Sequence, residues 1–279
     1  MYINRLIEVC KKYYFRKWNK VTIEVHASDH CNLSCSSCSH YAPIAKPKFA
    51  DLEILKESLK KLSPFADTIK RFRVVGGEPL LNTQICRIFE IANKYLPNVQ
   101  LEMTTNGILL PKMNPDFFDF FRKYDIMINV TQYPINKEEI YKNIEKILQK
   151  EKVKYDLSTL ESTLNKWNKI KLHKCSFPVL KSKIYFLKKS QCNRMCIQLV
   201  GDRLFPCNVS AYVYILNNAF GTKFIHRKDD YLEIDKIKSS KDIRKLLYKS
   251  HPFCSYHYQR FNHYNWRPSQ RKKEEWVLD

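Results

Sequence analysis

Short apolar runs and amphipathic helical patterns alternate along the first half of this chain. Five runs rich in β-branched residues have the length of strands, at 21–25, 69–75, 99–104, 126–131 and 153–157. Apolar residues at helical spacing fill the gaps between these runs, for example at Leu52, Leu55 and Leu59. Strands that alternate with helices of roughly 10–15 residues favour parallel pairing with right-handed crossovers. The pattern therefore predicts an α/β fold in which the carboxyl ends of the strands share one edge.

Three cysteines directly follow the first predicted strand. Cys31, Cys35 and Cys38 are separated by three and then two residues, on a polar and turn-prone run. Three thiolates this close can hold an iron–sulfur cluster, and a four-iron cluster held by three cysteines keeps one iron open to a substrate or cosubstrate. The alternative is a zinc site, which needs a fourth ligand that His30 or His40 could supply. The end of a strand is also where the sites of parallel barrels and open α/β sheets gather.

The cysteine spacing resembles the cluster motif of the radical S-adenosylmethionine (SAM) enzymes. Two further segments resemble motifs of the same family, in the family's order. They are Gly76-Gly77-Glu78-Pro79 at the end of the second strand and Thr104-Thr105-Asn106-Gly107 at the end of the third. In the family, the first of these segments holds the amino group of the methionine moiety. One departure is visible: many members carry an aromatic residue just before the last cysteine, where this chain has Ser37.

This resemblance implies a fold, two cofactors and a reaction. The fold is a partial (β/α)6, TIM-like barrel, and the cofactors are a [4Fe–4S] cluster and S-adenosyl-L-methionine. In similar enzymes the reduced cluster donates an electron to S-adenosylmethionine, the C–S bond breaks, and a 5′-deoxyadenosyl radical abstracts hydrogen from the substrate. The implied cofactor-binding residues are Gly76, Gly77, Glu78 and Pro79. Four polar residues at strand ends could also line the site, or serve only as turn and cap residues: Thr104, Asn106, Asn129 and Thr131.

A second group of cysteines lies beyond residue 180, where the alternating pattern ends. Cys196 precedes an apolar run, Gly201 marks a turn, and Cys207 follows the returning run. Gly between two apolar runs predicts a hairpin that places Cys196 and Cys207 together at its open end.

The region from about 190 to 257 resembles the twitch form of the SPASM auxiliary-cluster domain. That resemblance implies a second [4Fe–4S] cluster, for which the predicted metal ligands are Cys192, Cys196, Cys207 and Cys254. The fourth ligand stays open between Cys254 and His257, and Cys175 is a further candidate without a helpful spacing. A structural zinc bound by the same residues is the alternative.

Three regions are expected along the chain. Residues 1–20 form a basic amphipathic helix, 21–175 the radical SAM partial barrel, and 176–279 a small α+β iron–sulfur domain with a basic tail. The first helix could lie on a membrane surface, although such helices more often pack on their own domain. The tail from Trp266 is expected to pack as a final helix and to carry no chemistry.

The net charge of +21 indicates a surface that attracts anions. It favours an anionic substrate, such as a sugar linked to a nucleotide or a lipid phosphate, over an uncharged peptide. An RNA-modifying member of the superfamily is an alternative, although no appended RNA-binding motif is visible. A non-catalytic zinc-binding interaction module is another, and the metal content of the protein distinguishes it from an enzyme.

The remaining expectations concern location and partners. The chain has no apolar run of the ~18 residues that span a membrane, and its first residues lack the pattern of a signal peptide. Ten cysteines in a chain inside the cell favour metal binding or catalysis over disulfides. We therefore expect a cytoplasmic enzyme, with peripheral membrane contact as an open alternative. Its electron donor would be a protein such as flavodoxin or ferredoxin, and its substrate a small molecule or a peptide.

Overall fold

The computed structural model describes residues 20–135, 138–159, 166–168, 172–173, 196–248, 251–256 and 263–278. Within these residues the main element is an eight-stranded sheet with the order β10-β9-β8-β1-β2-β3-β4-β5. Its strands are β1 (Val21–Ser28), β2 (Ile69–Gly76), β3 (Gln100–Thr105), β4 (Met127–Gln132), β5 (Tyr155–Thr159), β8 (Cys196–Val200), β9 (Arg203–Phe205) and β10 (Leu232–Glu233). The five strands predicted in the first half are confirmed.

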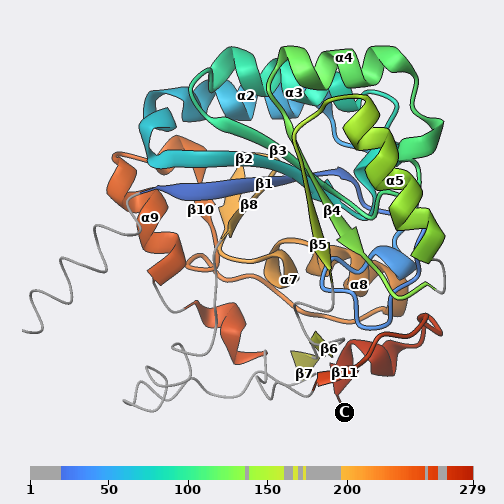
Figure 1. Cartoon of the computed structure of the whole chain (residues 1–279). Helices are drawn as coiled ribbons and strands as arrows, with labels where there is room; N and C mark the ends of the chain where they lie inside the picture. The colour runs from blue at the N-terminus through green and yellow to red at the C-terminus, as the bar shows by residue number, and fades with distance from the viewer. Residues whose placement is uncertain are drawn as a thin grey trace, which may run out of the picture.

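Strands β1, β2, β3, β4 and β5 pair in parallel in chain order, and β8 pairs in parallel with β1. Strands β9 and β10 extend the sheet beyond β8 by antiparallel pairing. The sixth parallel strand is therefore β8, which comes from the second half of the chain and lies beside β1 (Figure 1). The predicted α/β fold with a mainly parallel sheet is confirmed. The expected domain boundary at 175/176 lies outside the described residues.

Four helices cover one face of the sheet: α2 (Leu52–Leu62), α3 (Ile85–Tyr95), α4 (Pro115–Lys123) and α5 (Glu138–Lys150) (Figure 1). Their starts follow from local chemistry. Asp51 caps α2 by accepting hydrogen bonds from two backbone N–H groups, and Asn114 caps α4 by accepting one from Phe117. The basic amphipathic helix expected over residues 1–20 lies outside the described residues, except for its last position.

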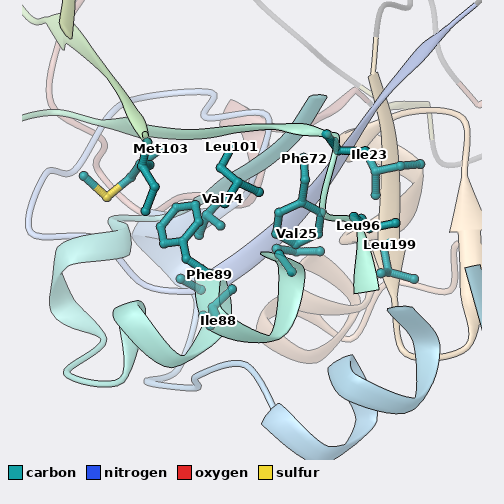
Figure 2. Packing of buried hydrophobic residues seen from close by; sticks show 14 of the residues in the cluster. Ile23, Val25, Phe72, Val74, Ile88, Phe89, Leu96, Leu101, Met103 and Leu199 are labelled. Atoms are coloured by element: carbon teal, nitrogen blue, oxygen red, sulfur yellow. The ribbon is translucent and has the colours of Figure 1, made fainter. Parts of the chain in front are cut away.

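The apolar core lies between these helices and the sheet. Phe72 and Leu101 from the strands pack with Ile88 and Phe89 from α3, and all four are buried (Figure 2). Burial of one such side chain contributes about 1.5–3 kcal/mol. Because successive side chains of a strand point to opposite faces, the residues between these apolar ones lie on the other face of the sheet.

A layer of charged residues crosses that opposite face. The Arg73 guanidinium lies 3.0 Å from a Glu24 carboxylate oxygen and 2.9 Å from one of Glu102, joining β1, β2 and β3. The Gln198 side chain of β8 donates to the second oxygen of Glu24 at 2.5 Å. Breaking a buried ion pair by removal of one partner costs about 3–5 kcal/mol. The ion pairs therefore stabilise the pairing of β1, β2 and β3, and the Gln198 hydrogen bond joins β8 to them.

The second half of the chain extends one edge of the sheet and packs on both of its faces. Tyr212 stacks on His26 on the charged face, whereas Ile243, Leu246 and Leu247 join the apolar core on the other. The hairpin β8–β9 turns at Gly201, which has φ 59°, as the sequence predicts. The helices that follow are α7 (Asn208–Ala211), α8 (Val213–Phe220) and α9 (Ser240–Tyr248). Two short strand pairs lie outside the main sheet: β6 (Lys166–Asn168) with β11 (His263–Asn265), and β7 (Leu172–His173) with β12 (Val277–Leu278). The 3-10 helices are η1 (Ala42–Ile44), η2 (Ser63–Thr68), η3 (Pro79–Leu81), η4 (Leu110–Lys112), η6 (Ile234–Lys236), η7 (Pro252–Ser255) and η8 (Lys273–Glu275).

The expectation of a final helix after Trp266 is wrong. Residues 266–278 form an irregular segment with one 3-10 turn and the short strand β12. Pro268 has no backbone N–H to donate in a helix, and Arg271 has φ 56°, in the left-handed region. The segment instead runs along the loop that carries the first three cysteines.

Candidate active site

A cavity of about 250 Å³ lies where the parallel strands end. Eight of the residues that line it were predicted for the site: Cys31, Cys35, Cys38, Gly76, Gly77, Thr104, Asn106 and Thr131. They come from the loop after β1 and from the ends of β2, β3 and β4. Glu78, Pro79 and Asn129 are outside the cavity lining. The fold thus brings all three family-like segments to one place.

The three thiols of this cavity are largely withdrawn from water. Burial raises the pKa of Cys31 to about 12, and the neighbouring Glu78 and Cys38 act in the same direction. Burial also raises the pKa of Cys35 and Cys38 well above the ordinary range. Buried thiolates need cations beside them, and iron bound by cysteine sulfur supplies the charge. Three thiols on one cavity therefore fit the cluster that the sequence predicts.

Zinc fits this arrangement less well. A structural zinc takes four ligands around a single ion. Across the described ranges, no three His, Cys, Asp or Glu side chains converge closely enough to hold one ion. A four-iron cluster is wider than one ion, so its ligand sulfurs stand further apart.

The glycine pair at the end of β2 allows a close approach between two backbones. A Cβ at Gly76 would lie 2.3 Å from the Ser28 carbonyl oxygen, and one at Gly77 would lie 2.0 Å from that of His30. The Gly77 N–H donates to the Ser28 carbonyl at 2.7 Å. These glycines therefore pack directly against the backbone of the segment that leads into Cys31, where a side chain would not fit. They also line the cavity.

Glu78 ties the ends of β2 and β3 together. Its carboxylate is buried and accepts hydrogen bonds from the Thr105 hydroxyl at 2.6 Å, the Asn106 N–H at 2.9 Å and the Leu80 N–H at 3.1 Å. Burial raises the pKa of Glu78, and these three donors oppose the rise. The Asn106 side chain in turn donates to the Asn32 side chain at 2.7 Å. Two sequence motifs and the cysteine loop, residues 29–41, thus form one hydrogen-bonded unit.

Several residues that line the site belong to none of the motifs in the sequence and were not predicted from it. Glu24, Arg73 and Tyr133 line the cavity, and burial raises the pKa of Tyr133 well above its ordinary value. Glu24 in β1 and Arg73 in β2 each stand between two apolar residues of a strand. A charged residue at such a position indicates which face of the sheet is polar. His40, considered above only as a zinc ligand, also lines the cavity.

A buried histidine network links this cavity to α7. The His40 Nδ1 lies 2.7 Å from the His26 Nε2, and the His40 Nε2 lies 3.1 Å from the Asn208 side-chain nitrogen. Because that nitrogen only donates, His40 accepts at Nε2 and donates from Nδ1. His26 then donates from Nδ1 to Asp29, at 3.0 Å. Burial lowers the pKa of His40 to about 3, so the ring is neutral.

The second group of cysteines is only partly described. Cys196 begins β8, and its sulfur lies 3.8 Å from an Arg73 guanidinium nitrogen; burial raises its pKa to about 12. The register Gln198↔Phe205 puts Cys196 and Cys207 at the same end of the hairpin, which confirms that prediction. Cys254 lies in η7, and Cys192 and His257 lie outside the described residues. The metal site itself stays a prediction.

Residues 25–182, more than half of the chain, match the family model of the Radical SAM superfamily. The chain belongs to this superfamily and is a radical SAM enzyme. The family implies a [4Fe–4S] cluster and S-adenosylmethionine as its cofactors, which agrees with the buried thiols and the cavity described above.

Comparison with known proteins gives two further similarities. The GTP 3′,8-cyclase of Aliarcobacter butzleri is 28% identical over 152 residues, which is 54% of this chain and 45% of that protein. The enzyme of the same name from Helicobacter pylori is 29% identical over the same length. The chain therefore matches less than half the length of these relatives. A crystal structure of BtrN in complex with AdoMet and 2-DOIA superposes with a TM-score of 0.52 at 16% identity, covering 93% of this chain and 98% of that one, which shows a shared fold.

The structure also bears on the membrane. No helix in the described part of the chain is long and apolar enough to cross a bilayer.

Proposed function

We propose that this enzyme cleaves S-adenosyl-L-methionine reductively at a [4Fe–4S] cluster held by Cys31, Cys35 and Cys38, and abstracts hydrogen from a small anionic substrate. The observation that carries the proposal is the 250 Å³ cavity, where three largely buried thiols meet the ends of β2, β3 and β4. When bound, the cluster supplies the electron that breaks the C–S bond of S-adenosylmethionine.

The protein's residues bind and orient the cofactor. Gly76 and Gly77 present their backbone to the methionine end of S-adenosylmethionine. The Glu78 carboxylate acts there through the three hydrogen bonds that hold the ends of β2 and β3 in place, and Pro79 opens the 3-10 turn η3 behind it.

Polar groups on the neighbouring strands complete the proposed cofactor site. Thr104, Asn106 and Thr131 line the cavity, and Asn129 pairs in register with Thr104, which places it next to this lining. Their hydroxyl and amide groups supply the few placed polar contacts that orient a ligand in a pocket.

Charge supports the class of substrate. The net charge of +21 draws anions from solution. The relatives that match this chain are named for a reaction of GTP, itself an anionic nucleotide. A nucleotide-linked or phosphate-linked sugar is therefore favoured over a peptide, and a protein such as flavodoxin or ferredoxin would supply the electron.

A second [4Fe–4S] cluster completes the proposal. Its ligands would be Cys192, Cys196, Cys207 and Cys254. Two of these, Cys196 and Cys207, share one end of the β8–β9 hairpin, which supports a common metal. In that position the cluster would accept an electron from a substrate radical or hold the substrate.

The test is anaerobic reconstitution with iron and sulfide, followed by a count of both and an assay for 5′-deoxyadenosine under reducing conditions. The expected result is iron and sulfide in equal amounts, with 5′-deoxyadenosine formed from added S-adenosylmethionine. Zinc without sulfide, or a fully loaded protein that forms no 5′-deoxyadenosine, would contradict the proposal.

A further inference from the structure

The last described segment of the chain lies directly along the cysteine loop. We call residues 266–278 the C-terminal strap. The Ser36 N–H donates to the Arg267 carbonyl at 3.0 Å, and the Ser269 N–H donates to the Ser34 carbonyl at 2.8 Å. Between these two bonds, Cys35 and Pro268 form an antiparallel bridge. The middle cysteine of the cluster motif is therefore held by backbone pairing with residues more than 230 positions away.

The far end of the strap holds the rest of the cysteine motif. The Trp276 indole N–H donates to the Cys38 carbonyl at 2.9 Å, and the Ser37 hydroxyl donates to the Glu275 carbonyl at 2.8 Å. Trp276 is buried, with 1% of its surface exposed. Ser37 has φ 54°, a left-handed conformation that costs energy for a residue other than glycine. These contacts fix that conformation, so the strap determines the shape of the loop between Cys35 and Cys38.

Trp266, at the start of the strap, carries a buried donor in need of an acceptor. Its indole Nε1 is buried, and it makes no hydrogen bond of ordinary geometry with any described residue. Unpaired buried donors are rare in proteins and point to a partner supplied by the bound state. Trp266 stands two residues before Pro268, the bridge partner of Cys35.

The acceptor that the strap brings beside this donor is the sulfur of Cys35. The Trp266 side chain interacts with the Cys35 side chain, and the bridge between Cys35 and Pro268 holds the two residues close together. The Tyr133 ring lies 6.4 Å from the indole, centre to centre, and also borders the cavity. The indole N–H is therefore enclosed between the cavity wall and a sulfur that becomes a strong acceptor once it is a thiolate.

We propose that Trp266 donates its indole N–H to the Cys35 sulfur in the cluster-loaded enzyme and raises the reduction potential of the cluster, while the C-terminal strap holds the cysteine loop. The inference rests on the proposed cluster at Cys31, Cys35 and Cys38. Reduction adds negative charge to a cluster, so a hydrogen bond to one of its sulfurs is stronger in the reduced state and favours it. Trp266 is in this sense a positioning residue that tunes the cofactor.

The experiment compares the wild-type enzyme with Trp266→Phe, which keeps the aromatic ring and removes the N–H. The reconstituted proteins are poised at a series of potentials, and the reduced cluster is followed by electron paramagnetic resonance, identified by its change when S-adenosylmethionine is added. At a fixed potential we expect the ratio of reduced to oxidised cluster to fall about threefold to tenfold in Trp266→Phe, where tenfold corresponds to about 59 mV for one electron. The iron content should be unchanged.

Trp276→Phe is the matched control, since the same change is made on the same strap. Its N–H donates to the Cys38 carbonyl instead of a sulfur, so we expect the variant to retain less iron. In protein that carries the cluster, the ratio of reduced to oxidised cluster should stay within about twofold of wild type. A Trp266→Phe ratio equal to that of wild type, in fully loaded protein, would overturn the inference.

A second measurement covers the case in which Trp266→Phe loses its cluster. Wild-type enzyme labelled with ¹⁵N in its indole nitrogens is examined by electron–nuclear double resonance. We expect one ¹⁵N-bound, exchangeable proton coupled to the reduced cluster, and the absence of that coupling would overturn the inference. A wild-type protein that binds no iron and sulfide would instead contradict the proposed function, so the two failures are distinct.

Discussion

The two groups of cysteines differ in how far the local chain fixes them. Cys31, Cys35 and Cys38 belong to one short loop, which is held by the glycine pair of β2, by Asn106 and by the C-terminal strap. The second group draws its members from separate elements, with Cys196 on β8 and Cys254 in η7. Ligands within one loop constrain each other through their spacing, whereas ligands on distant elements depend on the whole fold. The first group can therefore be recognised from the sequence with more certainty than the second.

Removal of the first group should have the largest effect. We expect the triple variant of Cys31, Cys35 and Cys38 to Ala to abolish formation of 5′-deoxyadenosine, because no other described thiol lines the cavity. The measurement is an anaerobic assay for 5′-deoxyadenosine by liquid chromatography. Cys86→Ala, on helix α3 and half-buried, is the matched control and should keep wild-type activity. Undiminished cleavage in the triple variant would remove this loop from the site.

Glu78→Gln should have the next largest effect, on affinity for S-adenosylmethionine. The substitution replaces one carboxylate oxygen by an NH₂ group among three donors, which disrupts a charge-assisted network worth roughly 1.5–3 kcal/mol. The dissociation constant should rise about tenfold to a hundredfold, measured by isothermal titration of the loaded enzyme. The exposed Glu57→Gln on α2 is the control.

Thr105→Val then distinguishes two ways in which Glu78 could act. If Glu78 works by positioning the strand ends, loss of the Thr105 hydroxyl that donates to it should also weaken binding, by a smaller factor. If Glu78 contacts the ammonium group of the cofactor directly, Thr105→Val should bind almost as well as wild type. Unchanged affinity in Glu78→Gln would contradict both.

The number of bound irons tests the second group of cysteines, and we expect it to differ by a factor of two between the wild-type protein and the triple variant. The wild-type protein should bind about eight irons and the triple variant at Cys31, Cys35 and Cys38 about four, because only the second cluster could then form. Cys207→Ala should likewise retain about four irons and keep its S-adenosylmethionine-dependent signal. One zinc and no sulfide in the triple variant would make the second group a structural zinc site and would remove its proposed role in electron transfer.

Sequence reasoning succeeds in this chain where the signal is local. The five parallel strands, the helices between them, the Asn114 cap and the hairpin turn at Gly201 follow from periodicity and turn chemistry within windows of a few residues. The clustering of three motifs in one cavity also follows, because parallel strands place their carboxyl ends along one edge.

The remaining features depend on contacts between distant residues. Pairing of β8 with β1 joins residues such as Gln198 and Glu24, which are 174 positions apart, and the strap reaches the cysteine loop through bonds such as Trp276 to Cys38, across 238 positions. No periodic pattern in the tail marks it as a partner of the first motif. The segment does not form the expected helix because backbone pairing with the cysteine loop, rather than a local pattern, determines its shape.

The smallest expected effect concerns the histidine network, which joins the two groups of cysteines. His40, two residues after Cys38, contacts Asn208, the residue after Cys207. The pKa of His40 is about 3 in the fold because of burial, against about 6.5 in an unfolded chain. Between these two pKa values the unfolded state binds more protons than the folded state. The contribution of neutral His40 to the free energy of unfolding is therefore fully present above pH 6.5 and is lost as the pH falls below it.

The free energy of unfolding of the cluster-free protein should therefore decrease between pH 7 and pH 5.5 more steeply in wild type than in His40→Gln. One such histidine contributes a slope of up to about 1.4 kcal/mol per pH unit, so the two proteins should differ by about 1 kcal/mol over this interval. Urea unfolding at the two pH values, followed by tryptophan fluorescence, gives the comparison. Equal slopes would mean that protonation of His40 is not linked to folding. The contact between the cysteine loop and α7 would then depend on other bonds, such as those from the Tyr41 hydroxyl to the Val209 carbonyl and from the Asn208 side chain to the Ser39 hydroxyl.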